Sequence, residues 1–248
     1  MKTSVVIKCT AAIALTAFCI FLLSAKPRLE KTRVLIFSKT NGYRHGSIPV
    51  GIDAIKKLGL ENDFDVDATE DSTSFNIDNL RKYSAVIFLS TTGKVFGPNE
   101  ENALKQYINS GGGFVGIHAA TDCEYNWQWY GDLVGGYFKS HPKQQTAKFM
   151  VVNKDHLSTK HLPDVWERFD ELYNFKYLNP DITVLINIDE KSYKGGENGK
   201  NHPMAWYHEY EGGRSFYTEL GHTDESFADP NYLKHILGGI LWVSEKKL

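Results

Sequence analysis

GGGFVGIHAA, residues 111–120, joins a short apolar run to a turn that carries a histidine. The run from Phe114 to Ile117 is typical of a central strand buried on both faces, and a glycine precedes the turn. Many α/β enzymes place a nucleophile at this position, but an imidazole acts instead as a general base, an acid or a metal ligand. The stretch therefore predicts an α/β sheet with a functional histidine, His118, beyond the end of a strand.

Strand-like and helical runs alternate before this stretch. Short β-branched or apolar runs lie at 33–38, 64–68 and 84–90, and apolar residues at helical spacing lie at 48–58 and 98–109. Proline in a first turn and glycine after a last turn mark the second of these helices. The order predicts an open parallel sheet, with ligands expected beyond the carboxyl ends of its strands.

The second half of the chain has strand-like runs with few helices between them. These runs lie at 148–152, 183–188, 204–210 and 215–220. They predict antiparallel strands added to the parallel sheet. A final helix over 232–243 has apolar residues on one face and is expected to cover the sheet.

Composition limits the classes of partner. The chain has 248 residues, 42% of them hydrophobic, which is enough for the core of one domain. Its 28 basic and 30 acidic residues leave a net charge of −2, so no basic field is available to bind nucleic acid. The loop at 39–47 lacks the G-x-G-x-x-G spacing and no phosphate-binding loop of the Walker type occurs, so no nucleotide cofactor is expected.

The N-terminus predicts export. Lys2 and Lys8 precede an apolar stretch that ends at Ala25, so residues 1–25 have the pattern of a secretory signal peptide. The predicted location is the periplasm or cell envelope, and an uncleaved N-terminal membrane anchor is the alternative. The remaining cysteine after this segment, Cys123, is either a small buried side chain or a nucleophile.

Polar residues gather where the predicted strands end. The loop at 39–47 carries Arg44 and His45 and opens a helix, whose N-terminus can receive an anion or sugar hydroxyls. Asp122 and an aromatic group that includes Trp127 follow His118. Aromatic faces beside carboxylates are typical of carbohydrate sites. A plain connection for the loop and a packed aromatic cap for the second group are the alternatives.

Several motifs occur in a fixed order along the chain. They are Tyr43-Arg44-His45, the run 112–118, Phe138-Lys139-Ser140-His141-Pro142, Asp170-Glu171-Leu172-Tyr173, His202-Pro203-Met204-Ala205-Trp206, and the run 213–222. Together they resemble the trehalose-utilisation (ThuA-like) family of the class I glutamine amidotransferase-like superfamily. The resemblance covers residues 32–244. It implies a flavodoxin-like open parallel sheet and a connection with disaccharide catabolism, often beside oxidoreductases that make 3-keto sugars.

The chain departs from the glutamine amidotransferases at one position. Those enzymes need a cysteine at the turn after the strand to form a thioester, and His118 occupies this turn. Glutamine hydrolysis is therefore not expected. The chain is predicted instead to be an exported carbohydrate-processing enzyme that acts on a disaccharide or 3-keto-glycoside by acid–base isomerisation, elimination or hydrolysis, with or without a metal.

Roles for individual residues follow from this expectation. His118 or His222 would be the catalytic base and Glu171 the acid partner. None of the nine histidines has compact metal-ligand spacing, so a divalent metal would need ligands assembled in space, with His118, His141 and His222 as candidates. The candidate substrate-binding residues are His45, Arg44, Asp122, Trp127, Tyr173, His202 and Trp206.

Two other classes of protein remain open from the sequence. A non-catalytic carbohydrate-binding protein of the cell envelope would use the same aromatic rings as stacking surfaces, and would tolerate the loss of one histidine. A regulatory or scaffold role is the third option. The sugar, the bond acted on, the metal and the oligomeric state are not determined by the sequence.

Overall fold

A nine-stranded sheet forms the centre of the computed structural model, which describes residues 31–245. Five adjacent strands of this sheet run parallel, in the order β2-β1-β3-β4-β11. Their bounds are β1 (Arg33–Phe37), β2 (Asp65–Thr69), β3 (Ala85–Leu89), β4 (Gly113–Ile117) and β11 (Gly213–Thr218). The predicted signal or anchor at 1–25 lies outside the described residues.

The sheet continues from β11 as antiparallel strands, in the order β10-β9-β6-β7. A separate two-stranded antiparallel sheet pairs β5 with β8. The bounds are β5 (Gly136–Ser140), β6 (Gln145–Val151), β7 (Val165–Asp170), β8 (Asn174–Leu178), β9 (Thr183–Ile188) and β10 (Pro203–Tyr210).

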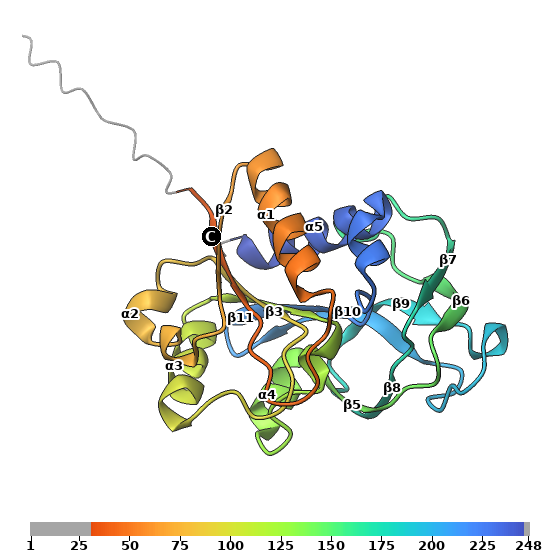
Figure 1. The fold of residues 1–248 in the computed structure, drawn as a ribbon, viewed down its shortest axis with the longest axis horizontal. Helices are drawn as coiled ribbons and strands as arrows, with labels where there is room; N and C mark the ends of the chain where they lie inside the picture. Colours follow the sequence, from red (N-terminus) through yellow and green to blue (C-terminus); the bar gives the residue numbers. More distant parts are fainter. Residues whose placement is uncertain (1–30, 246–248) are drawn as a thin grey trace, which may run out of the picture. The chain divides into compact units, whose positions relative to one another are not determined.

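Helices cover both faces of the sheet. Figure 1 shows α1 and α5 on one side of the sheet, and α3 and α4 on the other. The α-helices are α1 (Ile48–Glu61), α2 (Ile77–Leu80), α3 (Pro98–Asn109), α4 (Gln128–Val134) and α5 (Pro230–Ser244). Short 3-10 turns are η1 (Ser72–Ser74), η2 (His118–Thr121), η3 (Glu190–Ser192) and η4 (Asp224–Ala228). The three longest helices, α1, α3 and α5, each have a proline in the first turn, where the missing N–H costs no hydrogen bond.

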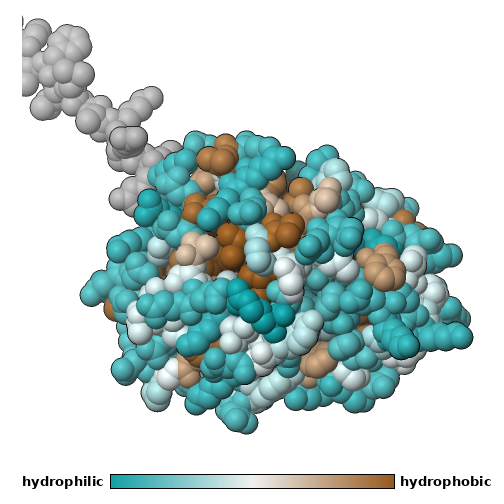
Figure 2. Space-filling model, viewed as in Figure 1, coloured by the Kyte–Doolittle hydropathy of each residue, from teal (hydrophilic) through white to brown (hydrophobic). Residues whose placement is uncertain are grey.

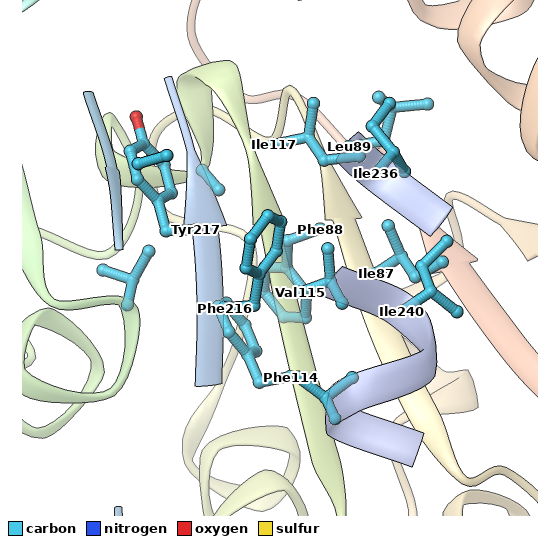
Figure 3. Packing of buried hydrophobic residues seen from close by; sticks show 14 of the residues in the cluster. Ile87, Phe88, Leu89, Phe114, Val115, Ile117, Phe216, Tyr217, Ile236 and Ile240 are labelled. Carbon is cyan, nitrogen blue, oxygen red and sulfur yellow. The ribbon is translucent and has the colours of Figure 1, made fainter. Parts of the chain in front are cut away.

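The core lies between the parallel strands and the helices. Every residue of β3 and β4 is buried, which explains their continuous apolar sequences. Figure 3 shows Ile236 and Ile240 of α5 beside Leu89 and Ile87 of β3. Burial of each such side chain stabilises the fold by roughly 1.5–3 kcal/mol. In Figure 2, hydrophilic residues cover most of the visible face, with fewer hydrophobic ones.

The predicted α/β fold, an open parallel sheet with added antiparallel strands, is confirmed. The prediction was wrong for the run at 215–220, because β11 pairs in parallel with β4 on one side and antiparallel with β10 on the other. The sequence analysis also missed β5, β7, β8 and α4. In β7 the buried positions alternate with exposed ones but include Arg168 and Asp170, and these polar residues hide the alternation. Within residues 31–245, every helix is too short or too polar to cross a membrane.

The end of α4 supplies a test of the packing against the sheet. Gly135 has φ +90°, and a Cβ at this position would lie 2.2 Å from Nε1 of the buried Trp206. We expect Gly135→Ala to lower the free energy of unfolding by about 2–4 kcal/mol, since strain and overpacking add. Gly199→Ala is the matched control, because Gly199 has φ +79° with no atom near the added Cβ. It should cost about 1 kcal/mol. Equal losses in urea denaturation would contradict the predicted clash.

Candidate metal centre and active site

His118 stands at a sharp turn directly after β4. Its φ of +52° lies in the left-handed region, which is uncommon for a residue other than glycine and marks a strained backbone. The residues around the turn must be small: a Cβ at Gly116 would lie 2.9 Å from Tyr217 and 3.2 Å from the methyl group of Ala120. The sequence GIHAA therefore allows β4 to turn into η2 and aim the imidazole away from the strand.

Four side chains converge at this turn. His45 follows β1, His118 follows β4, His222 follows β11 and Glu171 follows β7. Each offers one ligand atom, and these four atoms all lie within 4.8 Å of one another. His45, His118 and Glu171 are buried, and His222 is partly exposed. The first three strands are parallel, so their carboxyl ends share one edge of the sheet.

The contacts within the cluster are short. Nε2 of His118 lies 3.2 Å from Nε2 of His45 and 3.1 Å from Nδ1 of His222. Oε2 of Glu171 lies 3.1 Å from Nδ1 of His222 and 3.5 Å from Nε2 of His118. A neutral imidazole carries only one N–H. Three neutral imidazoles therefore cannot supply a proton for every one of these short contacts between ring nitrogens and the carboxylate.

The tautomer of His118 follows from its other nitrogen. Nδ1 lies 2.7 Å from the carbonyl oxygen of Glu219, so an N–H at Nδ1 donates there. Nε2 therefore carries a lone pair that points into the cluster. A backbone carbonyl that orients an imidazole in this way is the usual support of a metal-ligating histidine.

Ionisation of the cluster suits a cation. Burial raises the pKa of Glu171, but the hydrogen bond from His222 and the adjacent imidazoles of His118 and His222 outweigh this effect and hold that pKa well below its usual range. Burial, together with the charges of His118 and His222, lowers the pKa of His45 to about 3. Near neutral pH, Glu171 is an anion and His45 is neutral with a lone pair available. Burial lowers the pKa of His222, but its hydrogen bond to Glu171 raises it more, with a net rise.

The donor set fits a divalent transition metal. Imidazole nitrogens with one carboxylate oxygen are typical ligands of Zn²⁺ and its neighbours in the first row. Two ligand atoms that are each about 2.1 Å from one tetrahedral ion lie about 3.4 Å apart. The observed separations of 3.1 and 3.2 Å between ring nitrogens are close to this spacing. His45, His118, His222 and Glu171 thus form a candidate metal-binding group.

Tyr173 places a hydroxyl beside the cluster. Its oxygen lies 3.2 Å from Nε2 of His118, and its ring lies 4.6 Å from the His118 ring and 4.3 Å from that of Phe138. Its backbone N–H donates to Glu219 Oε1 at 3.1 Å, and its carbonyl oxygen lies 2.7 Å from Nε2 of His202. Burial raises the pKa of Tyr173 well above its ordinary value, so the hydroxyl keeps its proton and can donate it in a hydrogen bond.

His141 lies at the outer side of Glu171. Its Nδ1 is 3.1 Å from Oε1 of Glu171 and 2.9 Å from the carbonyl oxygen of Pro142. The Nδ1–H therefore donates to these oxygens, which leaves the lone pair on Nε2. The side chain is 43% exposed, far more than the cluster residues. The structure thus places His141, a predicted metal ligand, in contact with Glu171 and outside the group of four.

Polar and aromatic residues surround the cluster. The ring of Tyr43 is 66% exposed and packs edge-on against His45, with 4.8 Å between ring centroids. Asp122 accepts a hydrogen bond of 2.6 Å from the hydroxyl of Tyr125, and Lys176 Nζ lies 3.6 Å from the centroid of the Tyr125 ring. Burial raises the pKa of Asp122, and the hydrogen bond from Tyr125 together with the charges of Lys176, His118 and His141 offsets only part of this rise. Tyr43 thus offers an exposed ring beside a residue of the cluster.

Four predicted substrate-binding residues have other partners. Arg44 forms an ion pair of 2.7 Å with Glu70, and His202 is buried against Glu190 and the backbone of Tyr173. Trp127 stacks on Trp129 with 5.0 Å between centroids. Trp206 has no exposed surface, so it offers no face to a sugar.

Trp206 instead supports the turn from the core. Its ring stacks on that of Tyr217 at 4.4 Å, and the Tyr217 hydroxyl donates to the carbonyl oxygen of His118 at 2.7 Å. Cys123 is also buried; its thiol donates to the Gly93 carbonyl oxygen, and burial raises its pKa well above the usual range. Of the two readings of this cysteine, the structure favours the small buried side chain.

Three residues of the site were not singled out by the sequence analysis. Tyr43 lies on the loop of His45, and Asp170 directly precedes Glu171. For both residues, the position within a motif was the feature of the sequence that indicated a place near the site. Glu219 is a fully buried acid whose Oε2 has no hydrogen-bond partner, and burial raises its pKa well above the usual range. An acid directly after the strand-like run of β11 was the signal that could have identified it.

Known proteins were compared with the chain. A ThuA-like protein from Bacteroides uniformis has 26% identity and a TM-score of 0.72, and the match covers 86% of this chain and 91% of that one. A ThuA-like protein from Parabacteroides merdae has 22% identity and a TM-score of 0.71, with 88% and 93% covered. A β-galactosidase from Bacillus circulans, 14% identical with a TM-score of 0.54, is matched over 86% of this chain and 32% of its own; it shares the fold alone.

No match was found among curated proteins. The family model ThuA, described as trehalose utilisation, matches residues 33–243, which include every strand of the sheet and all four residues of the candidate metal-binding group. The chain therefore belongs to the ThuA (trehalose utilisation) family.

Proposed function

We propose that the protein is a carbohydrate-active enzyme whose active site is built around a divalent metal held by His45, His118, His222 and Glu171. The observation that carries the proposal is the convergence of these four donor atoms within 4.8 Å, on chain segments from four different strands. Buried imidazoles and a carboxylate so close together are costly without a cation that all of them can bind. Strained backbone at His118 is also typical of functional sites.

The substrate that we propose is a disaccharide or its 3-keto derivative. Membership of the trehalose-utilisation family supports a carbohydrate-related role. A 3-keto-glycoside suits the residues present, because its carbonyl acidifies the C2–H bond and needs only a base and groups that stabilise negative charge on oxygen. A divalent cation at the four donors would supply Lewis-acid polarisation of that carbonyl.

The protein's own residues then have separate roles. The Tyr173 hydroxyl donates a hydrogen bond to the carbonyl oxygen, where negative charge develops. His141 takes the C2 proton on Nε2, while Glu171 accepts the hydrogen bond from Nδ1 and orients the ring. Tyr43 offers an exposed ring on which an apolar face of the sugar stacks.

The proposed reaction is an elimination. The C2–H electron pair forms a C1–C2 double bond, and the C1–O glycosidic bond breaks with its electrons on the leaving oxygen. The protonated His141 returns a proton to that oxygen, so atoms and charges balance and no co-reactant is consumed. His118 and His222 serve as metal ligands in this scheme rather than as bases, because their site-facing nitrogens point at one another.

Carbohydrate binding without catalysis is the alternative, and it has less support. A binding protein would use the rings of Trp127, Trp129, Trp206 and Tyr173 as stacking surfaces, but Trp206 is buried and Trp127 and Trp129 stack on each other. Export to the cell envelope, with a cleaved signal or an N-terminal membrane tether, stays part of the proposal on the pattern of residues 1–25 alone.

Metal binding is the first test. We expect the full-length protein, stripped with a chelator, to take up close to one equivalent of Zn²⁺ or Co²⁺ and to regain turnover. His118→Ala and His222→Ala should each weaken affinity by more than about 100-fold, since each loses a ligand. His161→Ala is the control, because its ring bonds to the Asn231 carbonyl outside the cluster. Competition with a chromophoric chelator measures the affinities. Unchanged metal content in both cluster variants would disprove the ligand assignment.

Tyr173→Phe tests the hydroxyl. The variant keeps the ring that packs on Phe138 and His118, so the fold and the metal affinity should change little. Loss of the hydrogen bond to the developing oxyanion should lower kcat on a 3-keto-disaccharide by about 100–1,000-fold. Steady-state kinetics with product analysis measures the effect. Turnover equal to the wild type would remove Tyr173 from the mechanism.

His141→Ala separates proton transfer from metal binding. We expect metal affinity close to the wild-type value, because His141 contacts Glu171 and is not one of the four donors. Loss of the base should lower kcat by about 100–10,000-fold. Chelator competition and kinetics on the same preparation give both values. Loss of the metal together with activity would make His141 a ligand and refute its proposed role as the base.

A further inference from the structure

Asp170 is fully buried and lies outside the group of four donors, yet it bonds to the backbone of two of them. We infer that Asp170 is the positioning residue that sets Glu171 and His222 side by side. The effect of Asp170 on a bound metal rests on the proposed function. Its effect on the positions of the Glu171 and His222 backbones does not depend on that function.

The hydrogen bonds of Asp170 divide between its two oxygens. Oδ1 accepts the backbone N–H of Glu171 at 3.0 Å and that of His222 at 3.1 Å. Oδ2 accepts the backbone N–H of Gly221 at 3.2 Å, the hydroxyl of Ser226 at 3.0 Å and an Arg168 N–H at 3.4 Å. One carboxylate therefore holds three peptide groups in the two loops that carry the donor side chains.

Sheet pairing alone does not relate these two loops. Glu171 follows β7, which is an edge strand, and His222 follows β11. The strands β10, β9 and β6 lie between them in the sheet. Small errors of register or twist would accumulate over that distance, whereas Asp170 bonds directly to both backbones. A donor group displaced by about 1 Å is a common reason for the failure of a binding site.

Gly221, which Asp170 binds through its backbone N–H, also contacts the loop that carries His45. Gly221 has φ +120°, and a Cβ there would lie 2.3 Å from the Tyr232 hydroxyl, so glycine is required. Its carbonyl oxygen accepts a hydrogen bond of 3.1 Å from Ser47, two residues after His45. The path Asp170–Gly221–Ser47 thus links the loops of Glu171, His222 and His45.

Arg168 anchors Asp170 from the other side. Its guanidinium donates to Asp229 at 2.6 Å and to Ser226 at 2.8 Å, and lies 4.5 Å from the centroid of the Trp166 ring. Asp229, whose side chain is 30% exposed, pairs with the same guanidinium and caps α5 through the N–H of Asn231, but it bonds to none of the loop peptides held by Asp170. It is therefore a matched control for the stability of the network.

The experiment compares Asp170→Asn with Asp229→Asn in the full-length protein. Asparagine has one acceptor oxygen, so it cannot hold all three peptides, whereas at position 229 it still caps the helix. Hydrogen exchange of single amides, followed by NMR without metal, is the first readout. We expect the amide of Gly221, whose acceptor oxygen becomes an NH2 group, to exchange at least 10-fold faster in Asp170→Asn. The amides of Glu171, Gly221 and His222 should all keep wild-type rates in Asp229→Asn after correction for global stability. Equal rates in the two variants would overturn the inference.

Metal binding is the second readout. We expect Asp170→Asn to bind Co²⁺ about 10–100-fold more weakly with an altered visible absorption spectrum, as for loss of a group that orients ligands, and Asp229→Asn to match the wild type. A wild-type affinity and spectrum in Asp170→Asn would overturn the inference. Failure of the wild type to bind metal would instead refute the proposed function, and the amide rates would still decide the role of Asp170.

The wild-type protein supplies a test that needs no variant. If Asp170 holds the three peptides, their amides are protected in the native state and open together as denaturant is added. If Asp170→Asn fails to fold, this measurement decides the question: unprotected amides at Glu171, Gly221 and His222 in the wild type would overturn the inference.

Discussion

The parallel pairing of β4 with β11 is the constraint on which the site depends. The register joins Ile117 to Thr218, so the residues that follow both strands leave the sheet at the same edge. His118 comes next in one chain segment, and His222 lies a few residues on in the other. Their ring nitrogens meet at 3.1 Å because the strands that carry them are hydrogen-bonded neighbours. The loop of His45, after β1, reaches the same edge because β1, β3 and β4 are also parallel.

The charges and protonation states of the residues at this edge of the sheet determine which kind of ligand it can bind. A buried carboxylate is costly, and the low pKa of Glu171 reflects the two imidazoles that stabilise its charge. Burial lowers the pKa of His45 to about 3 and keeps its lone pair available. The centre thus presents the Glu171 anion and the neutral imidazole of His45 to whatever binds there, which suits a cation. The same strand-to-turn geometry that displays a nucleophile in many α/β enzymes here displays an imidazole, a group that can ligate a metal or transfer a proton.

The fold could be predicted where periodicity and burial agree. The runs of β3 and β4 are apolar throughout because both faces are covered, and the proline and glycine that bound α3 mark its ends. β11 was predicted to be one of the antiparallel strands because the sequence of a short strand does not show whether it pairs in parallel or antiparallel. β7 was not predicted because its buried face carries the ion pair of Arg168 and Asp170. Charged residues at these positions give the sequence pattern of a solvent-exposed face.

The sequence by itself determined the family, the α/β sheet and the position of His118 at the turn after a strand, since these depend on motif order and on local composition. It also supplied His45, Glu171, Tyr173 and His222 as candidates. Their grouping was decided only by the tertiary structure, which joins three histidines and one carboxylate and leaves Trp206 in the core. The physical reason is that a ligand set is a matter of distances of a few ångströms between residues far apart in the chain. Those distances are set by strand order, register and buried hydrogen bonds. The spacing of the residues along the sequence does not show any of these three features.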